Sequence, residues 1–146
     1  MDPQKPYTYR LSGGRYTVSI SNRARVEEAI AAFCRDIGIR SASVCGIGAV
    51  DEAVLRFYDP ATKRYVDRCF EEQMEIAALT GNVSEMEGKA YLHLHATLGR
   101  RDYTAVAGHL LSARINGAGE IFIMPFGAAT PRRYDPETGL NIYDFR

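Results

Sequence analysis

All three histidines of this 146-residue chain fall in one segment, residues 90–115, which reads AYLHLHATLGRRDYTAVAGHLLSARI. His93 and His95 are two residues apart in an apolar run, so in a β-strand both side chains leave the same face. Neutral imidazole is the commonest protein ligand for transition metals, and two histidines on one strand with a third nearby are a usual beginning of a zinc-type site. The spacing therefore predicts a metal site at His93, His95 and His109.

The histidines also have an interpretation without metal chemistry. Buried or interfacial histidines are common, and each of the three could simply hydrogen-bond to a backbone carbonyl. Glu75, just before a strand predicted at 76–83, could supply a fourth metal ligand or an acid/base group. Taken alone, a carboxylate at that place is more typical of a solvated charge at a strand edge. Both alternatives stay open on the sequence.

The metal hypothesis meets a difficulty of register. A hairpin symmetric about residues 103–104 would put Leu98 opposite His109 and leave His95 three residues further along the strand, roughly 10 Å away. Zinc–nitrogen bonds of about 2.0–2.1 Å cannot span that distance. We therefore expect either an asymmetric loop that folds His109 back towards His95, or a third ligand from another subunit.

Charge and composition exclude several classes of protein. Lys and Arg number 18, as do Asp and Glu, so no global positive field draws in nucleic acid. No run approaches the roughly 20 apolar residues of a membrane span, and the first ten residues lack the apolar core of a signal peptide. The three scattered cysteines, Cys34, Cys45 and Cys69, suggest reduced thiols. We expect a cytoplasmic protein without membrane contact.

The pattern of apolar residues predicts about eight short strands, mostly joined as hairpins, and one main helix. Strands are expected separately at 41–50 and 53–58, and again at 109–115 and 120–125 with a turn between them. The helix is expected to begin at Ser21 or Asn22 and to end at Gly38; its apolar positions are Val26, Ala29, Ile30, Phe33 and Ile37. Such a set of elements predicts an antiparallel α+β fold with the helix on one sheet face.

The length fits one domain spanning residues 1–146. Its core is expected at 7–126, and the polar, turn-rich tail at 127–146 should pack over the surface or over a neighbouring subunit. The glycines Gly46 and Gly48 do not form a dinucleotide-binding fingerprint, because Asp51 stands where a third glycine is needed. They predict a bulge or a close backbone approach instead.

Three ordered motifs carry a family resemblance. They are E-I-x-x-L-x-G-N at 75–82, H-x-H at 93–95 and G-H at 108–109. Over residues 7–126 the chain resembles the plants-and-prokaryotes conserved (PPC) domain. The resemblance implies an antiparallel sheet curled against helices, a homotrimer, and His93, His95 and His109 as metal ligands. Histidine ligation suits zinc, although nickel, copper and iron also accept imidazole.

The resemblance also raises the question of DNA. Plant members carry the domain after an AT-hook and serve nuclear, DNA-associated regulation, while stand-alone bacterial and archaeal relatives carry the label of predicted DNA-binding proteins. This chain lacks the Arg-Gly-Arg core of an AT-hook, and its nearest equivalent is Pro131-Arg132-Arg133. The neutral net charge argues against strong autonomous binding, but weak binding by a trimer that repeats its arginines three times stays open.

Three classes of function remain. The first, which we predict, is a trimeric metal-binding domain with a regulatory role in which DNA association is one possibility. The second is a zinc-dependent enzyme acting on a small molecule, with Glu75 or Asp102 as acid/base candidates. The third is a structural trimer without metal. Catalysis by a serine nucleophile or a phosphate-binding loop has no support, because neither motif is present.

Overall fold

Antiparallel pairing links every neighbouring pair of strands in the computed structural model, which describes residues 5–146. The first four residues of the expected domain therefore lie outside the described part. The elements are, in chain order, β1 (Tyr7–Ser12), β2 (Arg15–Ile20), α1 (Val26–Ile37), β3 (Ala42–Asp59), β4 (Arg64–Phe70), β5 (Met74–Met86), β6 (Lys89–Gly99), β7 (Ala105–Pro125), β8 (Arg132–Asp135) and β9 (Leu140–Tyr143). The predicted α+β class is confirmed.

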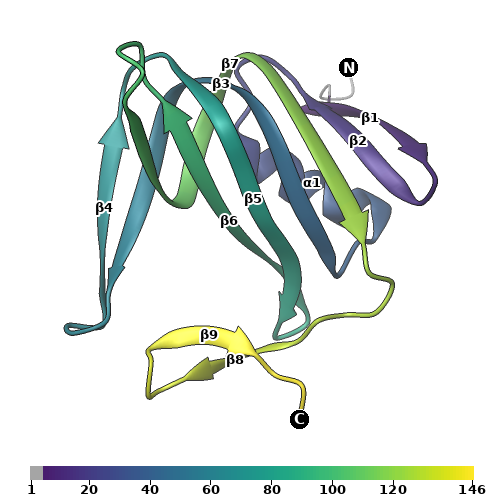
Figure 1. The fold of residues 1–146 in the computed structure, drawn as a ribbon. Coiled ribbons are helices and arrows are strands. Elements are labelled where there is room, and N and C mark those ends of the chain that lie inside the picture. The colour runs from purple at the N-terminus through teal and green to yellow at the C-terminus, as the bar shows by residue number, and fades with distance from the viewer. Residues whose placement is uncertain (1–4) are drawn as a thin grey trace.

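The main sheet curls until it closes on itself. Its strand order is β1-β2-β7-β6-β5-β3-β4, and β7 also pairs with β3, so β7, β6, β5 and β3 form a closed ring. The β8–β9 hairpin makes a separate two-stranded sheet, and Figure 1 shows it across the lower end of the main sheet, with α1 behind. The expected curled antiparallel sheet with one main helix is therefore confirmed, and trimer formation stays a prediction.

Two long strands replace the four short ones predicted in their place. β3 runs unbroken through Ala42–Asp59, and β7 through Ala105–Pro125, so the turn expected at 116–119 is wrong. The glycines there bend β7 at register shifts in its pairing with β3. The interpretation of Gly46 and Gly48 is confirmed, because the β3–β5 register shifts between them and a Cβ on either would lie 2.5 Å from a β7 carbonyl oxygen.

The helix packs its apolar side into the core and begins later than predicted. Arg25, not Ser21 or Asn22, is the residue before its first turn. The Asn22 side chain instead accepts a hydrogen bond from the Gly117 N–H, and the Ser21 carbonyl accepts one from Ala24. The predicted stop is confirmed, since Gly38 adopts the left-handed conformation with φ 80°.

No helix in residues 5–146 has the length and apolar character needed to cross a membrane. Cys34, Cys45 and Cys69 are free, and they lie respectively in the core, at an intermediate depth and at the surface. Burial raises the pKa of the Cys34 thiol to about 12. Cys34 therefore behaves as a small apolar core residue, as the sequence suggested.

Candidate metal centre

The register between β6 and β7 brings the histidines together. His95 lies directly opposite His109, and Leu98 pairs with Val106. The symmetric hairpin considered above, with Leu98 opposite His109, is therefore wrong by three residues. Because side chains opposite each other in an antiparallel ladder share a face, His109 joins His93 and His95 on one side of the sheet within a single chain.

A short, closed loop between the two strands sets this register. The Arg100 N–H donates to the Thr104 carbonyl across the loop, and the Tyr103 N–H donates to the Arg100 carbonyl. The Asp102 carboxylate accepts hydrogen bonds from the backbone and the hydroxyl of Thr104. Tyr103 adopts the left-handed conformation with φ 66°, which is unfavourable for a residue other than glycine. Because Gly99 pairs with Ala105, the turn is centred on Asp102 and not on residues 103–104.

The three imidazoles form a compact group. Their ring centroids lie 5.2 to 5.5 Å apart, and one nitrogen from each ring lies within 4.8 Å of the others. Tetrahedral zinc would hold such nitrogens about 3.4 Å apart, given zinc–nitrogen bonds of about 2.0–2.1 Å. Small side-chain rotations close that difference. The donor set and its spacing therefore fit a divalent transition metal.

Burial keeps two of the imidazoles in the form that binds metal. It lowers the pKa of His109 to about 4, helped by His93, His95 and Arg56 and opposed by Asp67. Burial also lowers the pKa of His93, with smaller contributions from Arg132 and His95. Both rings are neutral at pH 7, and a neutral imidazole has a lone pair free for coordination.

A glycine on β5 allows the histidine strand to lie where it does. Gly81 pairs with Leu94, and a Cβ added to Gly81 would lie 2.0 Å from the carbonyl oxygen of His93. Any side chain at this position would therefore push the His93 backbone away from β5. The glycine of the E-I-x-x-L-x-G-N motif thus has a steric role beside the candidate centre.

The histidine group opens into a cavity of about 690 Å³. The cavity lies between the sheet and the β8–β9 hairpin, and its wall combines arginines, tyrosines and apolar side chains. Besides the histidines it is lined by Arg56, Phe57, Tyr58, Tyr65, Asn82, Tyr91, Gly108, Arg132, Leu140, Asn141, Ile142 and Tyr143. Among the described residues, no aspartate or glutamate belongs to this lining.

The tail does more than cover the surface, because its hairpin is one wall of this cavity. Its start is held by the Glu85 N–H, which donates to the Thr130 carbonyl, and its turn by Lys63, whose Nζ donates to the Pro136 carbonyl at 2.9 Å. Tyr58 also donates to the Thr138 carbonyl. The sequence contained only a partial signal, since the turn residues at 135–139 precede the short apolar and aromatic run Leu140–Tyr143, whereas the strand before them reads RRYD.

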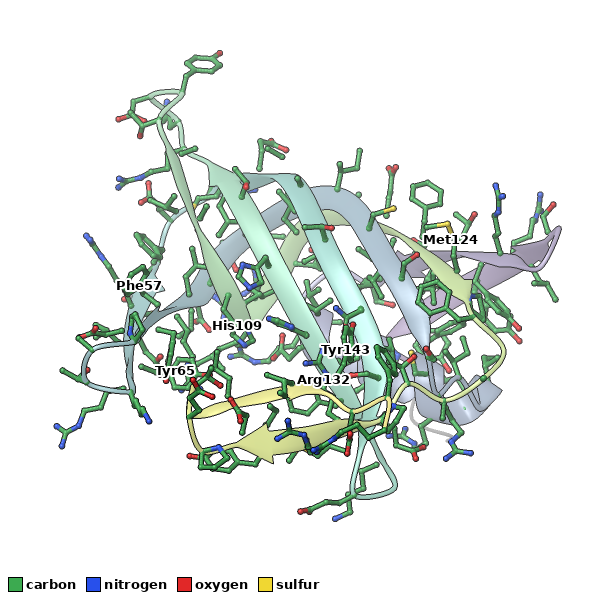
Figure 2. The ribbon with its side chains drawn as sticks, turned by 60° about the horizontal axis from the view of Figure 1, so that its bottom comes forward. Phe57, Tyr65, His109, Met124, Arg132 and Tyr143 are labelled. Carbon is green, nitrogen blue, oxygen red and sulfur yellow. The ribbon has the colours of Figure 1, made fainter. Side chains whose placement is uncertain are left out.

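Arg132 lines the cavity, a position that the sequence interpretation did not predict. Its guanidinium donates to Ser84 Oγ at 2.6 Å, to the Asn141 carbonyl at 2.7 Å and to Asn82 Oδ1 at 3.0 Å. Figure 2 shows Arg132 and Tyr143 between the hairpin and the sheet, on the side where His109 lies. In the sequence Arg132 was only one half of a basic pair.

The structure does not bring Glu75 or Asp102 to the histidines. Glu75 is exposed and pairs with Gly99, whereas His93 pairs with Asn82, seven residues further along β5 and roughly 20 Å away. Asp102 lies in the β6–β7 loop, where its carboxylate is engaged with Thr104. Neither carboxylate lines the cavity.

A known family of domains matches the part of the chain that carries the histidines. Residues 7–127 match the family model of the Plants and Prokaryotes Conserved (PCC) domain, the family abbreviated above as PPC. The chain belongs to this family. The PPC domain thus spans β1 to β7 and includes all three histidines. None of the curated proteins compared with the chain matches it.

Solved structures resemble this PPC domain over nearly its full length. A protein from Bacteroides thetaiotaomicron, called a "putative dna binding protein", is 53% identical, with 96% of this chain and 98% of that chain covered and a TM-score of 0.94. A metal-containing protein from Archaeoglobus fulgidus is 33% identical, with coverages of 94% and 96% and a TM-score of 0.84. A Pyrococcus horikoshii PPC protein, 22% identical with 94% of each chain covered and a TM-score of 0.82, shares the fold.

We predict that Gly81→Ala disturbs the histidine group because the new methyl meets the His93 carbonyl. Overpacking of this kind costs about 1–3 kcal/mol of unfolding free energy, measured by urea denaturation. The ¹⁵N signals of the imidazoles should move as well. Gly99→Ala is the matched control on the same strand pair, because its Cβ would meet nothing closer than 3.8 Å. Equal effects of the two substitutions would contradict this steric role.

Proposed function

We propose that His93, His95 and His109 hold one divalent metal, zinc by preference, and that the domain serves a regulatory role as a metal-dependent binding module. One observation carries this proposal: three imidazole nitrogens converge within 4.8 Å on the wall of a cavity. A related structure, 33% identical, is described as metal-containing, which supports the assignment. His95 is exposed, so a metal held there would have an open side facing a ligand.

A zinc-dependent enzyme is the second candidate, favoured by this open side. Three-histidine zinc supplies Lewis acidity and lowers the pKa of bound water to about 7. Proton transfer also needs an acid or base within reach, and no carboxylate lines the cavity in residues 5–146. The nearby Asp67 is bound by Arg56 through two hydrogen bonds of 2.7 and 2.9 Å. This chemistry favours ligand binding over hydrolysis.

Metal content tests the proposal directly. Untagged protein, whose only histidines are these three, should bind one zinc or cobalt ion per chain by elemental analysis and titration. Replacing any one of them by glutamine should weaken binding more than about 100-fold, because even residues that merely support metal ligands contribute 10- to 100-fold. Metal at 100 times its Kd should stabilise the fold by about 2.7 kcal/mol.

Glu75→Gln and Cys69→Ser are the controls for this experiment. Both residues are exposed and stand outside the histidine group, so both variants should bind metal as the parent does. Failure to find metal, together with unchanged thermal melting of the triple glutamine variant, would leave a domain without a metal centre.

We also propose that the domain assembles as a homotrimer, as expected from its family. Exposed apolar side chains support an assembly: Phe57 and Val66 pair across β3 and β4 and are 70% and 63% exposed. Sedimentation equilibrium should give three times the mass of one chain. Val66→Asp should shift the protein to smaller species, whereas Tyr103→Asp, at a loop position 98% exposed, should not. A wild-type protein that sediments as a single chain would contradict the trimer.

Association with DNA, suggested by the name of the 53% identical relative, is the weaker part of the proposed role. The chain has two pairs of adjacent arginines, at 100–101 and 132–133. Arg132 lies in the cavity, Arg133 pairs with Asp135 and Arg100 pairs with Glu72. This leaves the exposed Arg101 for phosphate contact, repeated three times in a trimer.

We therefore expect weak binding to duplex DNA that falls steeply with salt, measured by fluorescence anisotropy. Arg101→Gln should flatten the salt dependence, because a phosphate contact is lost from each copy. Sequence-specific binding that survives 200 mM salt would show that another surface recognises DNA. No salt-dependent binding at any concentration would remove DNA from the proposed role.

A further inference from the structure

Arg132 is held in place without a negatively charged partner. Its three hydrogen bonds go to a hydroxyl, an amide oxygen and a backbone carbonyl, and no carboxylate of residues 5–146 lies within ion-pair distance. The rings of Tyr91 and Tyr143 lie 5.0 and 4.3 Å from its guanidinium carbon. These contacts fix the orientation of the charge but leave it uncompensated.

The other arginine of the cavity differs in this respect. Arg56 forms a bidentate pair with Asp67, so its charge is neutralised before any ligand arrives. A guanidinium has five N–H groups, and Arg132 uses three of them. Two donors of Arg132 therefore remain for a ligand.

The rest of the cavity adds no negative charge. The lining contains no acidic residue among those described. A divalent metal bound there would add two further positive charges close to Arg132. Such an excess of positive charge, partly removed from water, favours an anion strongly.

The shape and the walls of the cavity limit which anion fits. About 690 Å³ is enough for an organic molecule, and Tyr58, Tyr65, Leu140 and Ile142 present mostly carbon. An inorganic oxyanion would leave those apolar walls in contact with water. A carboxylate with an apolar or aromatic body would satisfy the two free donors and cover the walls as well.

We propose that the cavity binds a small organic carboxylate, with its charged end between the histidine group and Arg132 and its apolar body against the tyrosines. The part of this proposal that involves the metal rests on the proposed function. The Arg132 contact does not, because it is a property of the chain itself. Regulation would then respond to a small carboxylate and not to the metal alone.

Calorimetric titration of the untagged protein with benzoate tests the inference, with benzamide as its neutral isostere and inorganic phosphate as a second anion. Benzoate should bind to the metal-loaded protein on the order of tenfold or more tightly than either competitor, the scale of one charge-assisted hydrogen bond. It should also alter the visible spectrum of the cobalt-loaded protein. Benzamide binding as tightly as benzoate would overturn the proposal, and tighter binding of phosphate would replace the organic ligand by an oxyanion.

Two substitutions of Arg132 separate its charge from its geometry. Arg132→Gln removes the charge and should weaken benzoate binding on the order of tenfold or more. Arg132→Lys keeps the charge without the planar guanidinium, so its affinity for benzoate should lie between that of the parent protein and that of Arg132→Gln. Arg133→Gln is the matched control on the same strand, because Arg133 pairs with Asp135 outside the cavity lining. Benzoate binding unchanged in both Arg132 variants would overturn the assignment.

Two measurements keep the result interpretable. Limited proteolysis of the chain after Pro125 reports whether the β8–β9 hairpin stays against the sheet. If Arg132→Gln releases the hairpin, the role of Arg132 is tested by Arg132→Lys and by the comparison of benzoate with benzamide. Metal content is measured on every sample. A protein that holds no metal but prefers benzoate through Arg132 refutes the metal proposal alone, whereas a metal-loaded protein indifferent to charge refutes the carboxylate alone.

Discussion

The pairing of His95 with His109 is the constraint on which the whole centre depends. Strand alternation puts His93 and His95 on one face, but only the β6–β7 register decides whether His109 arrives beside them. A slip of one residue would turn its ring to the opposite face. The closed loop at residues 100–104 fixes that register, and Gly81 lets β5 approach His93 closely enough to hold the strand in place.

The charges of the two arginines in the cavity wall are compensated differently. One arginine in its wall has an aspartate partner and the other has only neutral acceptors. No acidic residue among those described lines the cavity, and a bound cation would increase the imbalance. The same side chains that hold the hairpin against the sheet therefore also give the cavity its electrostatic preference, so structure and recognition are joined in Arg132.

Most of the fold and the three histidines could be predicted from the sequence, because period-two alternation and glycine signals are local. The register of the histidine hairpin could not, since it depends on the left-handed backbone of Tyr103 and on hydrogen bonds made by Asp102. The pattern at 116–119 predicts a turn because a bend within a long paired strand has the same composition as a turn. The role of Arg132 depends on contacts with β5, about 50 residues away in the chain, which no local pattern reveals.

The boundary of the family match divides the wall of the cavity into two parts. The match ends at residue 127, whereas the hairpin that walls the cavity spans Arg132–Tyr143. The histidines thus lie within the matched domain, and part of the cavity wall comes from the hairpin that follows it. A substitution in the hairpin can therefore change the cavity wall without altering the strands that carry the imidazoles.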